Sequence, residues 1–325
     1  MRRREFISLL GGAAASATWP RAASAQEAGR TYRLGFLIPV ERQAPAVVAF
    51  FDELRLNGFI EGHNLTLVPG GFEVRNEQIT ELVAAMVKAA PDAIVSGGDL
   101  TTRALQQATR TLPLIGMTDN MVAAGLVASL SRPGGNTTGI SLLSPELEGK
   151  RQDILIEAVP GARRMAVLAD STITAPWHLQ ALQGAVRARG VELSVVAVAK
   201  PEEIVPAIND ARASGAKAFN VLSSPMLFLN RRVIFERVAA LHLPAIYQWP
   251  EMAEEGGFAA YGPRFNPIFR QWSRMVVKVL RGAKPADLPI EQPTNFELVI
   301  NLKTAKAIGH EVPAGLVLRA DKLIE

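Results

Sequence analysis

The chain has 325 residues with no cysteine, and it carries 35 Lys and Arg against 31 Asp and Glu. The first 25 residues hold four arginines and one glutamate, so the remainder has 31 basic and 30 acidic residues. This balance leaves no clustered basic surface for nucleic acid, and the lack of cysteine excludes disulfides, thiolate chemistry, cysteine zinc sites and a lipid-anchoring cysteine.

Residues 1–25 have the pattern of a removable export signal. Arg3-Arg4 precedes an apolar stretch from Ile7 to Ala17, and the small residues Ala23-Ser24-Ala25 suit a cleavage site. The pattern predicts a twin-arginine-type signal peptide, cleavage near Ala25/Gln26 and a periplasmic protein. A signal anchor is the alternative, but this stretch is shorter than the roughly 20 residues of a membrane helix. No later apolar run is long enough for stable membrane insertion.

Short apolar runs and amphipathic stretches alternate along the rest of the chain. The runs at 33–38, 65–68, 93–95 and 113–117 predict one parallel sheet with helices on both faces. A second series after 139–141 predicts strands at 165–169, 191–198, 218–222, 244–247, 258–262 and 296–301, with a long helix over 265–280.

The length and the two series predict an α/β protein with two doubly wound parallel-sheet lobes around a central cleft. About 300 mature residues exceed a single core of ordinary size. We expect an N-terminal lobe from 32–140 plus about 256–290, and a C-terminal lobe from 141–255 plus about 291–325.

Small and polar residues follow the predicted strands of both lobes. In open parallel sheets, ligands bind beyond the carboxyl ends of the strands, where bulky side chains would block the backbone amides. Helix capping is the structural alternative for any one of these residues, since Ser, Thr and Asp often cap helices. Together they predict a binding site made of Ser96, Gly97, Gly98, Asp99, Thr118, Asp119, Ser141, Asp170, Ser171, Ser223 and Ser224.

Aromatic residues at strand ends are candidates for covering a planar ligand. Tyr247 and Trp249 end one predicted strand and Tyr261 ends the next, and core packing is an equally good explanation of all three. Phe269 and Trp272 lie on the stripe of a predicted helix, which indicates core packing.

Sequence patterns for catalysis, cofactors and metals are missing. The chain has no Gly-X-Ser-X-Gly, no P-loop lysine after Gly134-Gly135, and Pro39-Val40 where a dinucleotide-binding protein carries glycines. The four histidines form no pair at metal-binding spacing. We therefore expect no enzyme activity, no cofactor and no metal.

Four segments resemble a large bacterial family, the ABC transporter substrate-binding proteins of the tryptophan/tyrosine-binding type. They are the signal, the run Gly125–Gly139 (GLVASLSRPGGNTTG), Lys284–Pro289 (KPADLP) and Pro293–Lys306 (PTNFELVINLKTAK). The resemblance implies a type I periplasmic-binding fold with three crossings between lobes. It also implies that the lobes close on a ligand, which in this family is associated with aromatic amino acids, and deliver it to a membrane permease and its ATPase.

The sequence departs from this family in loops that the resemblance places at the cleft. The chain has Thr118-Asp119-Asn120 where relatives carry a Gly-Asp-Pro-like segment, and the stretches 171–176 and 263–265 also differ. The ligand of the family is therefore not transferred directly to this chain.

Our leading expectation is a monomeric solute-binding component of an ABC import system, which captures an aromatic or other apolar amino acid or a related carboxylate. Groups near Ser96, Gly97 and Gly98 would receive a carboxylate, and Asp119 or Asp170 would pair with an amine or hydroxyl. One or more of the aromatic residues named above would cover the apolar part. A receptor feeding a signalling system is the alternative, distinguished by a neighbouring histidine kinase gene, and an exported enzyme is a third, distinguished by turnover.

Overall fold

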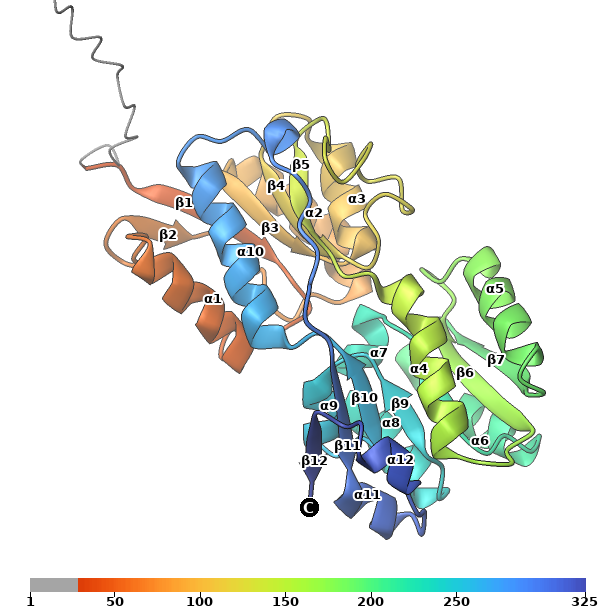
Figure 1. Cartoon of the computed structure of the whole chain (residues 1–325). Coiled ribbons are helices and arrows are strands. Elements are labelled where there is room, and N and C mark those ends of the chain that lie inside the picture. Colours follow the sequence, from red (N-terminus) through yellow and green to blue (C-terminus); the bar gives the residue numbers. More distant parts are fainter. Residues whose placement is uncertain (1–28) are drawn as a thin grey trace, which may run out of the picture. The chain divides into compact units, whose positions relative to one another are not determined.

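The structure, a computed structural model, describes residues 29–325, so the expected signal peptide lies outside the described residues. Residues Thr31–Glu325 form one compact unit that contains two β-sheets covered by helices (Figure 1). The prediction of an α/β protein with two sheet-based lobes is confirmed. We use "first lobe" for residues 32–141 and 265–291, and "second lobe" for 144–262 and 297–324.

The first lobe has a five-stranded parallel sheet in the order β2-β1-β3-β4-β5. Helices α1 and α10 pack together over one face, and α2 and α3 cover the other. The elements are β1 (Tyr32–Leu37), α1 (Pro45–Leu56), β2 (Leu65–Leu67), α2 (Ile79–Ala89), β3 (Ala93–Gly97), α3 (Asp99–Ala108), β4 (Leu114–Thr118), β5 (Thr137–Ser141) and α10 (Phe265–Leu280), with 3-10 turns at Asn76–Gln78 and Pro285–Asp287.

The second lobe has a seven-stranded sheet in the order β12-β11-β10-β9-β8-β6-β7, parallel except for the β10–β11 pair. Its strands are β6 (Arg164–Asp170), β7 (Glu192–Val198), β8 (Phe219–Val221), β9 (Ala245–Tyr247), β10 (Ala259–Gly262), β11 (Glu297–Asn301) and β12 (Lys322–Ile324). Its helices are α4 (Ser144–Ala158), α5 (Pro176–Arg187), α6 (Ile204–Ala213), α7 (Pro225–Leu229), α8 (Arg231–Ala240), α9 (Pro250–Glu254), α11 (Leu302–Ala307) and α12 (Ala314–Val317), with a 3-10 turn at Pro201–Glu203.

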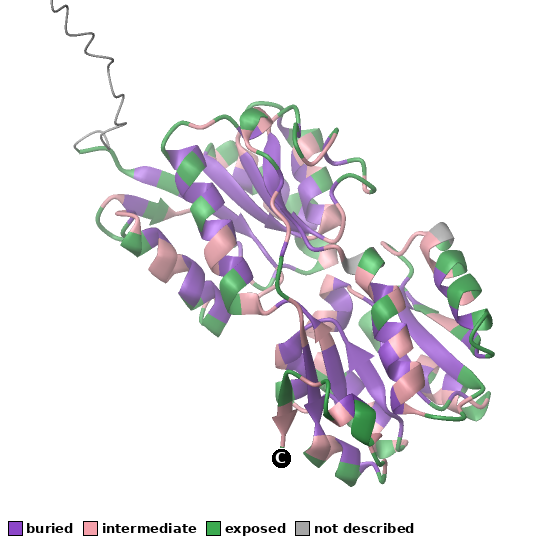
Figure 2. Cartoon of the chain, in the orientation of Figure 1, coloured by how far each residue is buried: buried purple, intermediate pink, exposed green. Residues whose placement is uncertain are grey.

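Alternating side chains explain why the strands are apolar throughout. On β3, Val95 joins the core beneath α1 and α10, whereas Ile94 joins the core beneath α2 and α3. Both faces of a sheet covered by helices are buried, so the strand needs apolar residues at every position. Figure 2 shows the consequence, since the strands of both sheets are mostly buried while the helices expose their outer sides.

Three short segments join the lobes, at residues 142–143, 263–264 and 292–296. Our expectation that residues from about 256 belong to the first lobe was wrong for 256–262. Strand β10 pairs with β9 and β11 in the second sheet, and the chain crosses only after Gly262. A four-residue buried strand gives no sequence signal for which sheet it joins.

The first crossing contains an unusual backbone conformation. Leu143 has a positive φ of 57°, which is uncommon for a residue other than glycine.

Within residues 29–325, every helix falls short of the length or apolarity needed to traverse a bilayer.

Candidate ligand-binding site

The carboxyl ends of strands from both sheets meet at a small cavity of about 90 Å³, which we call the central cavity. The first lobe contributes the ends of β1, β3 and β4, and the second lobe contributes the ends of β8 and β9. The lining comprises Ile38, Pro39, Val40, Gly97, Gly98, Asp99, Met117, Thr118, Asp119, Leu142, Ile173, Ser223, Ser224, Pro225, Phe228, Gln248, Trp249, Phe265, Phe269 and Trp272.

The two lobes approach closely at Gly98. This residue precedes α3 with a φ of 88°, and a Cβ placed on it would lie 3.2 Å from Cγ of Pro225 in the second lobe. A positive φ favours glycine because a side chain would clash with the backbone. Glycine therefore meets two needs here, the turn from strand to helix and the tight contact between lobes.

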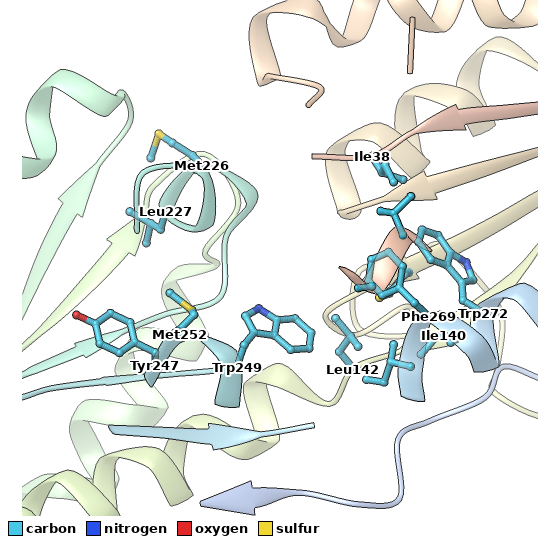
Figure 3. Close-up of a cluster of buried hydrophobic side chains, with 14 of the residues drawn as sticks. Ile38, Ile140, Leu142, Met226, Leu227, Tyr247, Trp249, Met252, Phe269 and Trp272 are labelled. Atoms are coloured by element: carbon cyan, nitrogen blue, oxygen red, sulfur yellow. The ribbon is translucent and has the colours of Figure 1, made fainter. Parts of the chain in front are cut away.

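Aromatic rings from both lobes form one wall of the central cavity. Trp249, just before α9, stacks on Phe265 at the start of α10, with ring centroids 4.2 Å apart and planes at 21°. Figure 3 shows the indole of Trp249 extending from the second lobe toward Leu142 and Phe269. Trp272 lies behind Phe269 and donates a 3.1 Å hydrogen bond from Nε1 to the carbonyl of Ile115. The wall suits a flat apolar group.

A second cavity of about 120 Å³, the acidic cavity, lies beside the first and shares Asp99, Asp119, Ile173 and Ser223 with it. Its remaining lining is Asn120, Ala123, Ala124, Glu148, Thr174, Ala175, His178 and Leu222. Ser223 donates a 2.7 Å hydrogen bond from Oγ to Oδ1 of Asp119. This bond joins the second lobe to the first at the point where the cavities meet.

Burial perturbs the acids of this region. Burial and, to a smaller extent, the negative charge of Asp119 raise the pKa of Asp99 to about 7. Burial likewise raises the pKa of Glu148 to about 7, against the opposing effect of Arg151. Within residues 29–325, Oδ1 of Asp99 and Oε2 of Glu148 have no hydrogen-bond partner. Both oxygens are buried, and the amide of Ser223 and the side chain of Asn220 also favour the ionised form of Glu148.

Glu148 also belongs to a buried ion pair on α4. Its Oε1 lies 2.8 Å from Nη1 of Arg151, and the two side chains are 2% and 1% exposed. Arg151 donates a further 2.8 Å hydrogen bond from Nε to the carbonyl of Tyr261, in β10 just before a crossing segment. The ion pair thus links the acidic cavity to the connection between the lobes.

A third cavity of about 750 Å³, the outer cavity, opens beyond the aromatic wall. It shares Pro39, Val40, Phe228, Phe265 and Phe269 with the central cavity, so the two form one continuous cleft. Its lining includes three arginines, Arg75, Arg231 and Arg232, whereas neither smaller cavity is lined by Lys or Arg. The cleft therefore has carboxylates at both ends, since six glutamates also line the outer cavity, and it contains arginines only at its outer end.

Eight of the fourteen residues that the sequence suggested line the central or acidic cavity: Gly97, Gly98, Asp99, Thr118, Asp119, Ser223, Ser224 and Trp249. The other six lie elsewhere. Ser96 is buried and its hydroxyl pairs with that of Thr102, and Ser141 accepts a hydrogen bond from the amide of Met121. Ser171 is exposed and donates to the carbonyl of Val198.

Asp170 and the two tyrosines are also directed away from the cavities. The Asp170 carboxylate accepts hydrogen bonds from Thr172 and from Ser224, which also caps α7. Tyr247 is fully buried against Phe235, and Tyr261 has its ring 6.4 Å from that of Phe296. The amide of Gly98 donates to the carbonyl of Met117, so it is not free to receive a carboxylate as we had expected.

Sequence reasoning missed several lining residues. The apolar stripe of α10 contains Phe265, Phe269 and Trp272, and this pattern indicates core packing. Phe269 and Trp272 are indeed buried, and all three residues also line the central cavity. Glu148 lies within a helix, where a glutamate gives no signal of burial. Gln248 follows a strand that ends in aromatics, and its Oε1 has no hydrogen-bond partner within the described part of the chain.

Comparisons with known proteins agree with this architecture. A family model described as ABC transporter substrate binding protein matches residues 50–324. The Tyrosine-binding protein of Clostridioides difficile (strain R20291) is 24% identical over 266 residues, covering 80% of this chain and 75% of that protein.

Two solved structures have the same fold. One is a conserved domain protein from Vibrio cholerae O1 biovar El Tor, with a TM-score of 0.81 and 23% identity, covering 90% of this chain and 100% of that one. The other is an ABC domain in complex with L-Trp from Streptococcus pneumoniae, with a TM-score of 0.79 and 21% identity, over the same shares of the two chains.

Proposed function

Because the chain belongs to the ABC transporter substrate-binding protein family, we propose that it captures an amino acid with an aromatic or other apolar side chain between its lobes. The observation that carries the proposal is one cleft in which buried carboxylates lie beside an aromatic wall, with both lobes contributing to each. The family comprises binding proteins rather than enzymes.

The apolar side chain of the ligand would occupy the central cavity against Trp249 and Phe265. Its amino group would face Asp119, because an ammonium group is attracted to a carboxylate in a poorly hydrated site. Its carboxylate would point toward the outer cavity, where the arginines of the cleft lie. The Clostridioides difficile relative is named for tyrosine and the Streptococcus pneumoniae structure holds L-Trp, which supports an aromatic ligand.

Ligand capture in this scheme is a change in lobe position without covalent chemistry. A ligand that contacts both lobes binds more tightly when the lobes are close together, so its binding favours that closed arrangement. The bond from Ser223 to Asp119 and the contact of Gly98 with Pro225 would form in the same arrangement. A membrane permease and its ATPase would then receive the ligand for import.

Export to the periplasm is part of the proposal and rests on residues 1–25. The Arg3-Arg4 pair should direct the folded chain through the twin-arginine route, with cleavage near Ala25/Gln26. Replacing both arginines by lysine should retain the uncleaved precursor in the cytoplasm, whereas replacing Arg21 should leave export unchanged. N-terminal sequencing of the periplasmic protein would locate the cleavage site.

A thermal-shift screen of the twenty amino acids on the mature chain tests the proposal. A ligand at 100 times its dissociation constant adds about 2.7 kcal/mol of apparent stability. Among analogues of a tryptophan hit, tryptamine should retain more affinity than indole-3-propionate, because it keeps the amino group. No shift with any amino acid, or a preference for the analogue without an amine, would count against this function.

A further inference from the structure

Phe265 begins α10, a helix of the first lobe, yet its ring packs mainly on the second lobe. The ring stacks on Trp249 with centroids 4.2 Å apart, and it lies edge-on to Phe228 with centroids 5.4 Å apart. The ring of Phe269, its neighbour on α10, is farther away at 5.9 Å. Trp249 and Phe228 both belong to the second lobe. We call the three rings of Phe228, Trp249 and Phe265 the aromatic platform.

The backbone amide of Phe265 is also bound by the second lobe. It donates a 3.0 Å hydrogen bond to Oε1 of Glu251 on α9. The first amides of a helix have no partner within the helix, and a carboxylate at a helix N-terminus is stabilised by the helix dipole. A residue of the second lobe therefore caps the long helix of the first.

The first turn of α10 is held weakly by its own backbone. Pro267 has no amide hydrogen to donate, and the bond from the amide of Ile268 to the carbonyl of Arg264 is 3.4 Å long. Ordinary bonds of this kind measure about 2.7–3.2 Å. The chain that leaves the second crossing can therefore bend most easily within this turn.

Arg264, in the second crossing, fixes the residue before Phe265 to the second lobe. Its Nε donates a 2.6 Å bond to Glu297 on β11, and its Nη1 donates a 2.8 Å bond to Glu254 on α9. Lys322 on β12 also pairs with Glu254, at 2.8 Å. The side chains of Arg264, Glu254 and Glu297 are 23%, 28% and 37% exposed, and a partly buried network of charges resists separation better than an isolated exposed pair.

We propose that Phe265 moves with the second lobe, so that the aromatic platform is already assembled when the lobes are apart and receives the apolar group of the ligand before they close. Arg264 and Glu251 are then positioning residues, which act on the ligand through Phe265. The inference rests on the proposed function and adds an order of events to it, in which closure brings Asp119 of the first lobe to a ligand already on the second. A site assembled in advance lowers the ordering cost of binding.

Fluorine NMR on the ligand-free mature chain, with fluorinated tryptophan in place of tryptophan, tests the assembly directly. The Trp249 resonance is assigned with Trp249→Phe. Gly98→Leu serves as a wedge between the lobes, because a side chain at Gly98 would meet Pro225, and a larger radius of gyration in X-ray scattering verifies the opening. Phe265→Leu removes the stacked ring, and it should shift the Trp249 resonance equally with and without the wedge.

A shift that disappears in the wedged chain, or no shift in either chain, overturns the inference. If Gly98→Leu does not fold, Ser223→Leu is a second wedge, since Ser223 contacts Asp119 of the opposite lobe.

The charged network provides a second comparison in the wedged chain. Arg264→Met, and separately Glu251→Gln, should reduce the effect of Phe265→Leu on the Trp249 resonance, and Arg264→Lys should restore part of it. Arg164→Met, which breaks an exposed pair on β6, is the matched control and should leave the effect unchanged. Equal behaviour of Arg264→Met and Arg164→Met overturns the positioning role.

Calorimetry with L-tryptophan separates this inference from the proposed function. The wedged chain should still bind tryptophan, more weakly than the wild type. Trp249→Ala should remove that residual binding, whereas Asp119→Asn should leave it unchanged. Residual binding that depends on Asp119 and not on Trp249, or no binding by the wedged chain while the wild type binds, overturns the order of events. If the wild type does not bind tryptophan, the proposed ligand class is at fault, and the fluorine measurement decides the inference alone.

Discussion

The hydroxyl of Ser223 donates a hydrogen bond of 2.7 Å to the carboxylate of Asp119, across 104 positions of sequence and from one lobe to the other. Both residues follow strands, β8 and β4, and both line the central and acidic cavities. The bond can form only when the carboxyl edges of the two sheets face each other at short range. It therefore connects the position of the lobes to the group that we assign to the amine of the ligand.

Replacing Ser223 by alanine should weaken ligand binding. A hydrogen bond to a charged group contributes about 1.5–3 kcal/mol, so the dissociation constant for L-tryptophan should rise roughly tenfold or more. Calorimetry on folded protein gives the value. Ser171→Ala is the control, since Ser171 also follows a strand of the second lobe but lines neither cavity. Equal losses of ligand affinity in the two variants would show that Ser223 has no specific role in binding.

The stacked pair Trp249 and Phe265 should discriminate among side chains. Trp249→Ala removes the ring that covers the central cavity, and L-tryptophan affinity should fall by roughly tenfold or more, because aromatic pairs add about 0.5–1.5 kcal/mol beyond their buried area. Trp249→Phe should lose less. Circular dichroism establishes that both variants are folded before binding is measured. Unchanged affinity in the alanine variant would place the ligand elsewhere.

Tyr247 should matter for stability and not for binding. Its ring is fully buried against Phe235, and its hydroxyl has no hydrogen-bond partner among residues 29–325. Burial also raises the pKa of this phenol. Because an unsatisfied buried hydroxyl costs about 1–3 kcal/mol, Tyr247→Phe should raise the free energy of unfolding by about 1 kcal/mol. A fall in stability, or a loss of ligand affinity, would show that the hydroxyl has a partner.

Breaking the ion pair between Arg151 and Glu148 should lower the free energy of unfolding by an amount that depends on pH. Arg151→Met leaves Glu148 buried and unpaired, which costs about 3–5 kcal/mol in comparable cases. Burial already raises the pKa of Glu148 to about 7, and without Arg151 the pKa rises further. The variant then holds a proton that the wild type has released as pH increases, so its loss of stability should be larger at pH 8 than at pH 6.

Urea unfolding at both pH values measures that difference. Arg164→Met breaks an exposed pair with Glu192, whose side chains are 59% and 70% exposed, and serves as the control. It should cost less than about 1 kcal/mol at either pH. A pH-independent loss in Arg151→Met would mean that Glu148 stays ionised without its partner.

The sequence was sufficient to predict two lobes and the segments that reach the cleft. Gly97–Asp99, Thr118–Asp119 and Ser223–Ser224 lie at or just beyond the carboxyl ends of parallel strands, and such ends share one edge of the sheet. The likeness to tryptophan/tyrosine-binding proteins is confirmed at the family level, since the family model covers residues 50–324.

Side-chain direction could not be predicted in the same way. Ser96 and Asp170 lie within their strands and their side chains bond inside the lobes, to Thr102 and Ser224. Thr118 is also the last residue of a strand, but it lines the central cavity. Tyr247 and Trp249 differ by two positions, but only Trp249 lies beyond the strand and turns toward the cleft. Glu148 became a site residue through the packing of α4, which depends on contacts distant in sequence.

The most direct measurement is calorimetric titration of the twenty amino acids into the mature wild-type chain and into Asp119→Asn. We expect at least one amino acid with an apolar or aromatic side chain to bind the wild type, and the variant to bind it at least tenfold more weakly, which corresponds to about 1.4 kcal/mol. Binding of the same amino acid with equal affinity to both proteins, or binding of none, would contradict a ligand held between the lobes by the inner carboxylates.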